Sequence, residues 1–218
     1  MRKKIPAFFI VLCSWTFSFG QETFLNTDLQ GLLSFSKSYF RSDPFTREFS
    51  AFLKHLINDP EIEIKRIRKK TDTSLYLFSG RYKNYNPFFF KPNRVEVILQ
   101  EVPLQLEDSL QATDTVFIYQ LLAFTGNTEK NIKEVKKEFE KIHRQTAKKF
   151  YETKYDEEKK GDELIGELNH YFLSLYWFSP LSVSWGKLED KPETVLALTL
   201  RFKMESNEPV LIGSLLNK

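Results

Sequence analysis

Cysteine, glycine and long apolar runs are all scarce in this chain of 218 residues. The only cysteine is Cys13, and eight glycines are scattered along the sequence. Cys13 lies in an N-terminal segment that we expect to be removed. The mature chain then has no disulfide, no thiolate metal site and no cysteine nucleophile. The seven glycines after residue 20 form none of the glycine-rich loops that cradle phosphates in nucleotide-binding proteins.

Motifs of the common hydrolases are missing as well. The sequence has no Gly-x-Ser-x-Gly, no His-Glu-x-x-His and no Ser-x-x-Lys accompanied by its partner motifs. Two Glu-x-x-His pairs occur, Glu140/His143 and Glu167/His170. On the helices expected there, the two histidines would face different directions. We therefore expect no catalytic residues, no metal and no cofactor. An enzyme without a motif is a less favoured alternative, because catalytic groups can be assembled from distant loops.

The N-terminus has the layout of an export signal. Arg2, Lys3 and Lys4 precede an apolar stretch at residues 5–19, which is long enough for a signal-peptide core but shorter than the ~20 residues of a membrane-spanning helix. Small residues at positions 18 and 20 favour cleavage before Gln21. We predict a signal peptide at 1–20 and a single α+β domain at 21–218, exported to a periplasm or secreted. An uncleaved anchor and a buried helix are the alternatives.

Removal of this signal leaves a mature chain with no net charge. The whole sequence has 32 basic and 29 acidic residues, and residues 1–20 contain three of the basic and none of the acidic ones. The mature chain therefore has 29 of each. Its overall charge gives no support for nucleic-acid binding, and we do not expect that partner. Without disulfides, the exported domain depends on its core, to which the 17 phenylalanines after residue 20 contribute large apolar areas.

Hydrophobic periodicity predicts helices, then strands, then helices, then strands. Helices are expected at 28–41 and from the Asp43-Pro44 start signal to Asp59-Pro60. Strands are expected at 61–69, 73–83, 94–102 and 115–124, the last of them central because it is apolar on both faces. Two further helices are expected at 129–160 and, after Gly161, around 164–175. Strands at 181–185, 194–203 and 209–216 complete an α+β domain with a mainly antiparallel sheet and helices on one face.

One segment departs from the charge balance of the rest. Residues 65–94 contain nine basic residues and one acidic residue, Asp72, so they carry +8 and the other mature residues carry −8. Aromatic residues are interleaved with these charges, including three consecutive phenylalanines between Pro87 and Pro92. The flanking prolines predict a loop there. The candidate binding surface consists of Lys65, Arg66, Arg68, Lys69, Lys70, Arg81, Lys83, Phe88, Phe89, Phe90, Lys91 and Arg94.

This surface predicts an exported, non-enzymatic binding or envelope-interaction protein. A cationic, aromatic-rich face suits an anionic partner: an anionic lipid, an envelope polymer or an acidic protein surface. A structural alternative is that the lysines protect an edge strand and that the phenylalanines fold back over the core. A third possibility is a carrier of an apolar ligand such as a lipid, lined by the aromatic residues of 171–185. The sequence gives no indication of the oligomeric state.

Overall fold

One antiparallel sheet with helices on one face forms the domain, as the sequence predicts. The computed structural model describes residues 29–46, 48–69, 74–104, 114–150, 152–160, 163–171, 179–188, 191–205 and 208–210. The predicted signal peptide, residues 1–20, lies outside these ranges. Among the described residues, no helix has the length and apolar character needed to cross a membrane.

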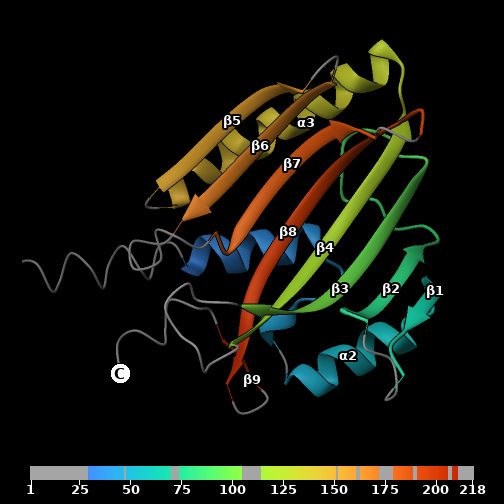
Figure 1. The fold of residues 1–218 in the computed structure, drawn as a ribbon, viewed down its shortest axis with the longest axis vertical. Coiled ribbons are helices and arrows are strands. Elements are labelled where there is room, and N and C mark those ends of the chain that lie inside the picture. The colour runs from blue at the N-terminus through green and yellow to red at the C-terminus, as the bar shows by residue number, and fades with distance from the viewer. Residues whose placement is uncertain are drawn as a thin grey trace, which may run out of the picture.

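The sheet consists of two four-stranded meanders joined at its centre (Figure 1). The first contains β1 (Ile62–Ile67), β2 (Tyr76–Tyr82), β3 (Arg94–Leu104) and β4 (Asp114–Gly126). The second contains β5 (Glu152–Lys160), β6 (Glu163–Tyr171), β7 (Leu181–Lys187) and β8 (Glu193–Glu205). The strand order is β1-β2-β3-β4-β8-β7-β6-β5, and the short β9 (Glu208–Val210) pairs with β8. Both β1 and β5 are therefore edge strands.

The centre of the sheet is the antiparallel pair of β4 and β8. Their register places Phe117 opposite Phe202, and Leu121 opposite Leu198. These four side chains are buried, because alternate residues of a strand share one face and this face lies under the helices. The prediction that residues 115–124 form a central strand is confirmed.

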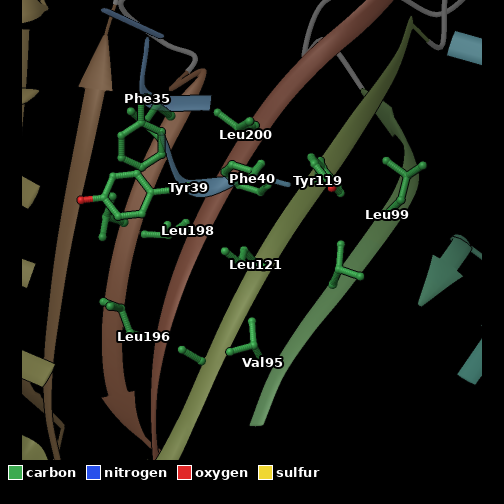
Figure 2. Packing of buried hydrophobic residues seen from close by; sticks show 14 of the residues in the cluster. Phe35, Tyr39, Phe40, Val95, Leu99, Tyr119, Leu121, Leu196, Leu198 and Leu200 are labelled. Atoms are coloured by element: carbon green, nitrogen blue, oxygen red, sulfur yellow. The ribbon is translucent and has the colours of Figure 1, made fainter. Parts of the chain in front are cut away.

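All described helices cover the same face of the sheet. They are the helix at residues 29–39, α2 (Phe49–Asn58) and α3 (Glu129–Thr146), with 3-10 turns η1 (Pro44–Thr46) and η2 (Ala147–Lys149). Figure 2 shows Phe35 and Tyr39 of the first helix near Leu198 and Leu200 of β8, and Phe40, just after this helix, beside Tyr119 of β4. The predicted apolar ridge of α3 is confirmed, since Val135, Phe139 and Ile142 are buried.

Two predicted helices are wrong in their extent. The helix expected at 129–160 ends at Thr146, and the expected helix at 164–175 is β6 over its described part, through Tyr171. After Phe150, residues 152–160 contain no row of apolar residues that a helix could bury. Pairing with β6 therefore decided their structure. The register of Lys160 with Glu163 leaves only Gly161 and Asp162 between the strands in the sequence. Gly-Asp is a favoured hairpin sequence, and it is the signal that the helical interpretation overlooked.

The start of α2 also differs from the prediction. The Asp43-Pro44 signal starts the 3-10 turn η1, and α2 begins five residues later, at Phe49. Asp43 still acts as a cap, because its Oδ1 accepts hydrogen bonds from the Phe45 N–H at 3.0 Å and from the Ser36 hydroxyl at 2.9 Å. The predicted end at Asp59-Pro60 is confirmed.

Candidate functional site

The loop that joins β2 to β3, residues 83–93, contains the three consecutive phenylalanines, and we call it the Phe loop. Phe88 and Phe90 are buried, with 7 % and 6 % of their surfaces exposed, whereas Phe89 between them is 80 % exposed. The two buried rings therefore attach the loop to the core, and the middle ring projects outward.

Polar contacts within the loop define its shape. The Asn86 side chain accepts the Phe88 N–H at Oδ1 (3.0 Å) and donates from Nδ2 to the Phe90 carbonyl (3.0 Å). Such an Asx turn mimics a backbone turn. The Tyr85 hydroxyl donates to the Tyr39 carbonyl at 2.8 Å, which ties the loop to the first helix. The loop is thus held on both sides of Phe89.

A buried carboxylate of α3 holds Phe89 itself. Glu138 is 3 % exposed, and its Oε2 accepts the Phe89 N–H at 2.9 Å. Its Oε1 accepts from Lys141 Nζ, also at 2.9 Å. The same ammonium lies 3.3 Å from the centre of the Phe89 ring, within the range of a cation–π contact. The exposed ring therefore has a defined position beside a cation.

Sequence reasoning missed Glu138 and Lys141, because it interpreted the charges of this helix as a solvated face. The sequence nevertheless contained a signal that Glu138 would be buried. Glu138 is three residues after Val135 and four before Ile142, so helical periodicity places a carboxylate within the apolar ridge. A buried carboxylate requires partners, and the Phe89 N–H and Lys141 are those partners.

We expect Glu138→Ala to lower the free energy of unfolding by about 1–3 kcal/mol, because it leaves the Phe89 N–H and the Lys141 ammonium without their carboxylate acceptor. Urea unfolding measures the loss, and amide hydrogen exchange should show faster exchange at Phe89. Glu140→Ala is the matched control, since Glu140 is an exposed residue of the same helix and should change stability by less than about 0.5 kcal/mol. Equal effects of the two substitutions would contradict this role for Glu138.

Two tyrosines beneath the loop have strongly raised pKa values. Burial, and after it the charge of Glu138, raises the pKa of Tyr39 to about 12. Burial likewise raises the pKa of Tyr85 to about 12, with Arg41 opposing the shift. Both phenols therefore stay neutral hydrogen-bonding groups at ordinary pH. They support the loop and offer no base for catalysis.

The structure divides the predicted basic surface into two parts. In the part nearest β1, cations are paired with carboxylates: Lys65 with Glu96, Arg68 with Glu101, and Arg94 with both Glu96 and Glu193. Arg66 lies over the Tyr76 ring, 5.8 Å from its centre. Lys69 is exposed, and Lys70 lies outside the described residues. This part is largely neutralised.

The second part surrounds a groove of about 260 Å³ between the two stems of the Phe loop. Four of the predicted cations line it: Arg81, Lys83, Lys91 and Arg94. Tyr82, Tyr85 and several asparagines complete the lining, which contains no carboxylate among the described residues. We call this feature the basic groove. The structure thus brings Arg81, Lys83 and Lys91 together, and Arg94 stands between the two parts because it lines the groove while it is paired with Glu96 and Glu193.

A second hollow lies on the other side of the Phe loop. It has a volume of about 440 Å³ and lies between the first helix and α3, with Phe89, Lys141 and Lys149 in its lining. Phe89 therefore stands between an open cleft with two lysines and the loop stems that carry Arg81, Lys83 and Lys91. The exposed ring is flanked by cations on both sides.

The aromatic residues of the alternative apolar carrier are described only in part, and the two Glu-x-x-His pairs do not lie on successive helices. Trp185 is buried in the core under Lys136, whose Nζ lies 4.8 Å from its ring centre, and residues 172–178 lie outside the described ranges. His143 is on α3, but His170 belongs to strand β6, not to the helix we expected. Within the described ranges, no group of His, Cys, Asp and Glu is arranged to hold a metal ion.

No protein-family model, no curated protein and no solved structure matches the chain.

Proposed function

We propose that this protein is an exported, non-enzymatic binding protein that attaches reversibly to an anionic lipid surface through the Phe loop. Phe89 is the apolar anchor. Lys91, Lys83 and Arg81 supply the positive charge, and Lys141, which is paired with Glu138, lies against the Phe89 ring. The exposure of Phe89 on a firmly held loop carries this proposal.

The exposure of Phe89 differs from that of the other apolar side chains. The remaining large exposed hydrophobic residues among those described are 38–48 % exposed, against 80 % for Phe89. Single exposed apolar residues are common, but this one is held in place by a buried carboxylate and two buried neighbours. An aromatic ring presented in this way suits insertion into the interface of a bilayer, where aromatic rings are favoured.

The kind of cation around Phe89 favours a lipid surface over a protein partner. Three of the four charges nearest the loop are lysines, which are depleted at protein–protein interfaces. Lysine is a flexible point charge without a fixed fork, and it therefore suits a fluid surface that offers no fixed acceptor. An acidic protein surface is the alternative outcome of the test below.

Rough magnitudes indicate reversible attachment. Each basic residue near an anionic membrane contributes about 1 kcal/mol, and burying one phenylalanine ring contributes about 1.5–3 kcal/mol. Three unpaired cations and one ring give about 5 kcal/mol, which corresponds to a dissociation constant of roughly 0.2 mM. Attachment of this strength is peripheral and weakens with salt.

The test is sedimentation of the mature protein with vesicles of phosphatidylcholine alone or mixed with phosphatidylglycerol. We expect binding only to the anionic vesicles and loss of binding as salt is raised. Lys91→Glu should weaken binding roughly 30-fold, since it changes the charge by two units at about 1 kcal/mol each. Lys54→Glu makes the same change at an exposed position of α2 and should have little effect.

Equal binding to both kinds of vesicle, or binding to neither, would refute attachment to anionic lipid. If vesicles fail but an acidic protein is recovered with the wild type and lost with Lys91→Glu, the partner is a protein. Export is tested separately by the mass of the protein isolated from its own cells. Loss of residues 1–20 is expected.

A further inference from the structure

We propose that the basic groove is a binding site for a phosphate group, and that the phosphate is that of a lipid headgroup at the attached surface. This inference rests on the proposed function and adds a defined recognition site to it. Phe89 provides apolar attachment. The groove, on the opposite side of the loop, selects the chemistry of the headgroup.

The groove is built by the register of β2 and β3. Tyr82 pairs with Val95, and Arg81 with Glu96, so the hairpin stem closes directly below the loop. The loop then returns Lys91 to the side of the stem that carries Lys83. The basic groove has a volume of about 260 Å³, which is enough for several water molecules at about 30 Å³ each. A phosphate group with part of its hydration fits such a space.

A neighbouring hollow shows what a neutralised cationic cleft looks like in the same molecule. It has a volume of about 540 Å³ and contains Lys65, Arg94 and Lys191, but Glu96 and Glu193 line it too. Arg94 is engaged there, with Nη2 2.8 Å from Glu193 Oε2 and Nε 3.0 Å from Glu96 Oε1. The basic groove differs by having no carboxylate in its lining. An anion entering it would meet Arg81, Lys83 and Lys91, which form no ion pair with a described carboxylate, whereas Arg94 at its edge is already paired with Glu96 and Glu193.

Three of the four cations that line the groove, Arg81, Lys83 and Lys91, are available to a ligand. Arg81 is exposed, and its one described contact is a long bond of 3.5 Å from Nη2 to the Asn93 carbonyl. Glu63 and Glu96 are its cross-strand neighbours, yet among the described residues neither forms an ion pair with it. An arginine fork binds two phosphate oxygens at once. Arg81 is therefore the residue that gives the groove its geometric selectivity.

Lysines supply the remaining charge. Lys83 Nζ donates to the Pro60 carbonyl at 2.7 Å, which fixes its position at the rim. Because a carbonyl carries no net charge, the positive charge of Lys83 is not neutralised by this bond. Lys91 is exposed and forms no ion pair with any described carboxylate. Because its ammonium has three donors, Lys83 can bind a ligand oxygen while it keeps the bond to Pro60.

The experiment compares two vesicle preparations of equal negative charge. One contains phosphatidate, and the other contains a sulfonated glycolipid without phosphate. The wild type should bind the phosphatidate vesicles more tightly. Arg81→Lys keeps the positive charge but removes the fork, and it should remove that preference by weakening phosphatidate binding about tenfold, the effect of losing a charged hydrogen bond, while leaving binding to the sulfonated lipid nearly unchanged. Lys91→Gln, a second variant, guards against a folding defect in the first.

A soluble probe separates the groove from the attachment. Glycerol phosphate should shift the amide NMR signals of residues 81–94 in the wild type and in Phe89→Ala, and it should not do so in Arg81→Gln. Sulfate at the same concentration should cause smaller shifts. Equal responses to sulfate, or unchanged responses in Arg81→Gln, would overturn the phosphate site.

The two proposals can fail independently. If vesicle binding depends on Phe89 but shows no preference for phosphate, the attachment stands and the phosphate site is wrong. If glycerol phosphate binds through Arg81 but no vesicle is bound, the groove takes a free phosphate ester and the lipid source is wrong.

Discussion

Phe89→Asp should abolish measurable binding to anionic vesicles while leaving the fold intact. The substitution removes the apolar anchor, about 1.5–3 kcal/mol when a phenylalanine is fully buried, and places a negative charge against an anionic surface, at about 1 kcal/mol per charge. The combined loss corresponds to a roughly 100-fold or greater weakening. Stability should change little, because the ring is 80 % exposed and the backbone N–H that donates to Glu138 is retained.

Leu75→Asp is the matched control for this variant. Leu75 is 48 % exposed and precedes β2, at the other end of that strand from the Phe loop. It gives the same change from an apolar to an acidic side chain. Vesicle sedimentation and thermal unfolding should be measured for both variants. Undiminished binding by Phe89→Asp, or an equal loss in Leu75→Asp, would show that Phe89 is not the anchor. Phe89→Trp should bind at least as well as the wild type, because tryptophan favours the membrane interface.

Stability should fall steeply above pH 10. A group of four buried or half-buried tyrosines lies between the sheet and the helices: Tyr39, Tyr82, Tyr85 and Tyr119. Burial is the main cause that raises each pKa, to about 12 for Tyr39 and Tyr85 and further for Tyr82. The pKa of the fully buried Tyr119 is also raised well above its ordinary value, by burial first and then by the neighbouring Tyr82.

Stability decreases with rising pH because the folded chain binds these protons more tightly than the unfolded chain does. Below pH 10 these phenols are neutral in both the folded and the unfolded chain, so their neutral form costs nothing on folding. Above pH 10 the unfolded chain loses the protons while the folded chain keeps them to about pH 12. Unfolding then releases protons, and each tyrosine lowers stability by up to about 1.4 kcal/mol per pH unit. Four such groups together make this a large effect.

Urea unfolding between pH 8 and pH 12 measures this dependence. The free energy of unfolding should be flat up to about pH 10 and then decline. Tyr119→Phe should make the decline shallower, since it removes one ionisable group. Tyr76→Phe, at a surface position that is 38 % exposed, should leave it unchanged. A decline of equal slope in Tyr119→Phe would mean that the buried tyrosines do not cause the alkaline loss.

Much of the fold could be predicted from local patterns. Alternation at Val95, Val97 and Leu99 and the two apolar faces of residues 116–124 identified β3 and the central β4. The ridge of Val135, Phe139 and Ile142 identified α3. These elements bury one face or both, so their periodicity records their environment directly. The β5–β6 hairpin was missed because β5 is mostly polar and because Leu164, Ile165 and Leu168 of β6 are also spaced as in a helix; the pairing of β6 with β5 and β7 decides their structure.

The candidate site could be predicted only in part, for an electrostatic reason. The sequence shows nine basic residues in a thirty-residue segment, but spacing along a chain does not show which charges meet carboxylates from elsewhere. Glu193 is 99 residues from Arg94 and yet neutralises it. Glu138 is 49 residues from Phe89 and holds its backbone. Neither contact leaves a local pattern near the loop.

The sequence alone determined the α+β class, the charge asymmetry of residues 65–94 and the presence of a proline-flanked aromatic loop, because each depends on composition or on short-range periodicity. The tertiary structure decided which cations stay unpaired and which of three identical rings faces outward. Both depend on strand register and on the position of α3, and these are set by packing between segments far apart in the chain.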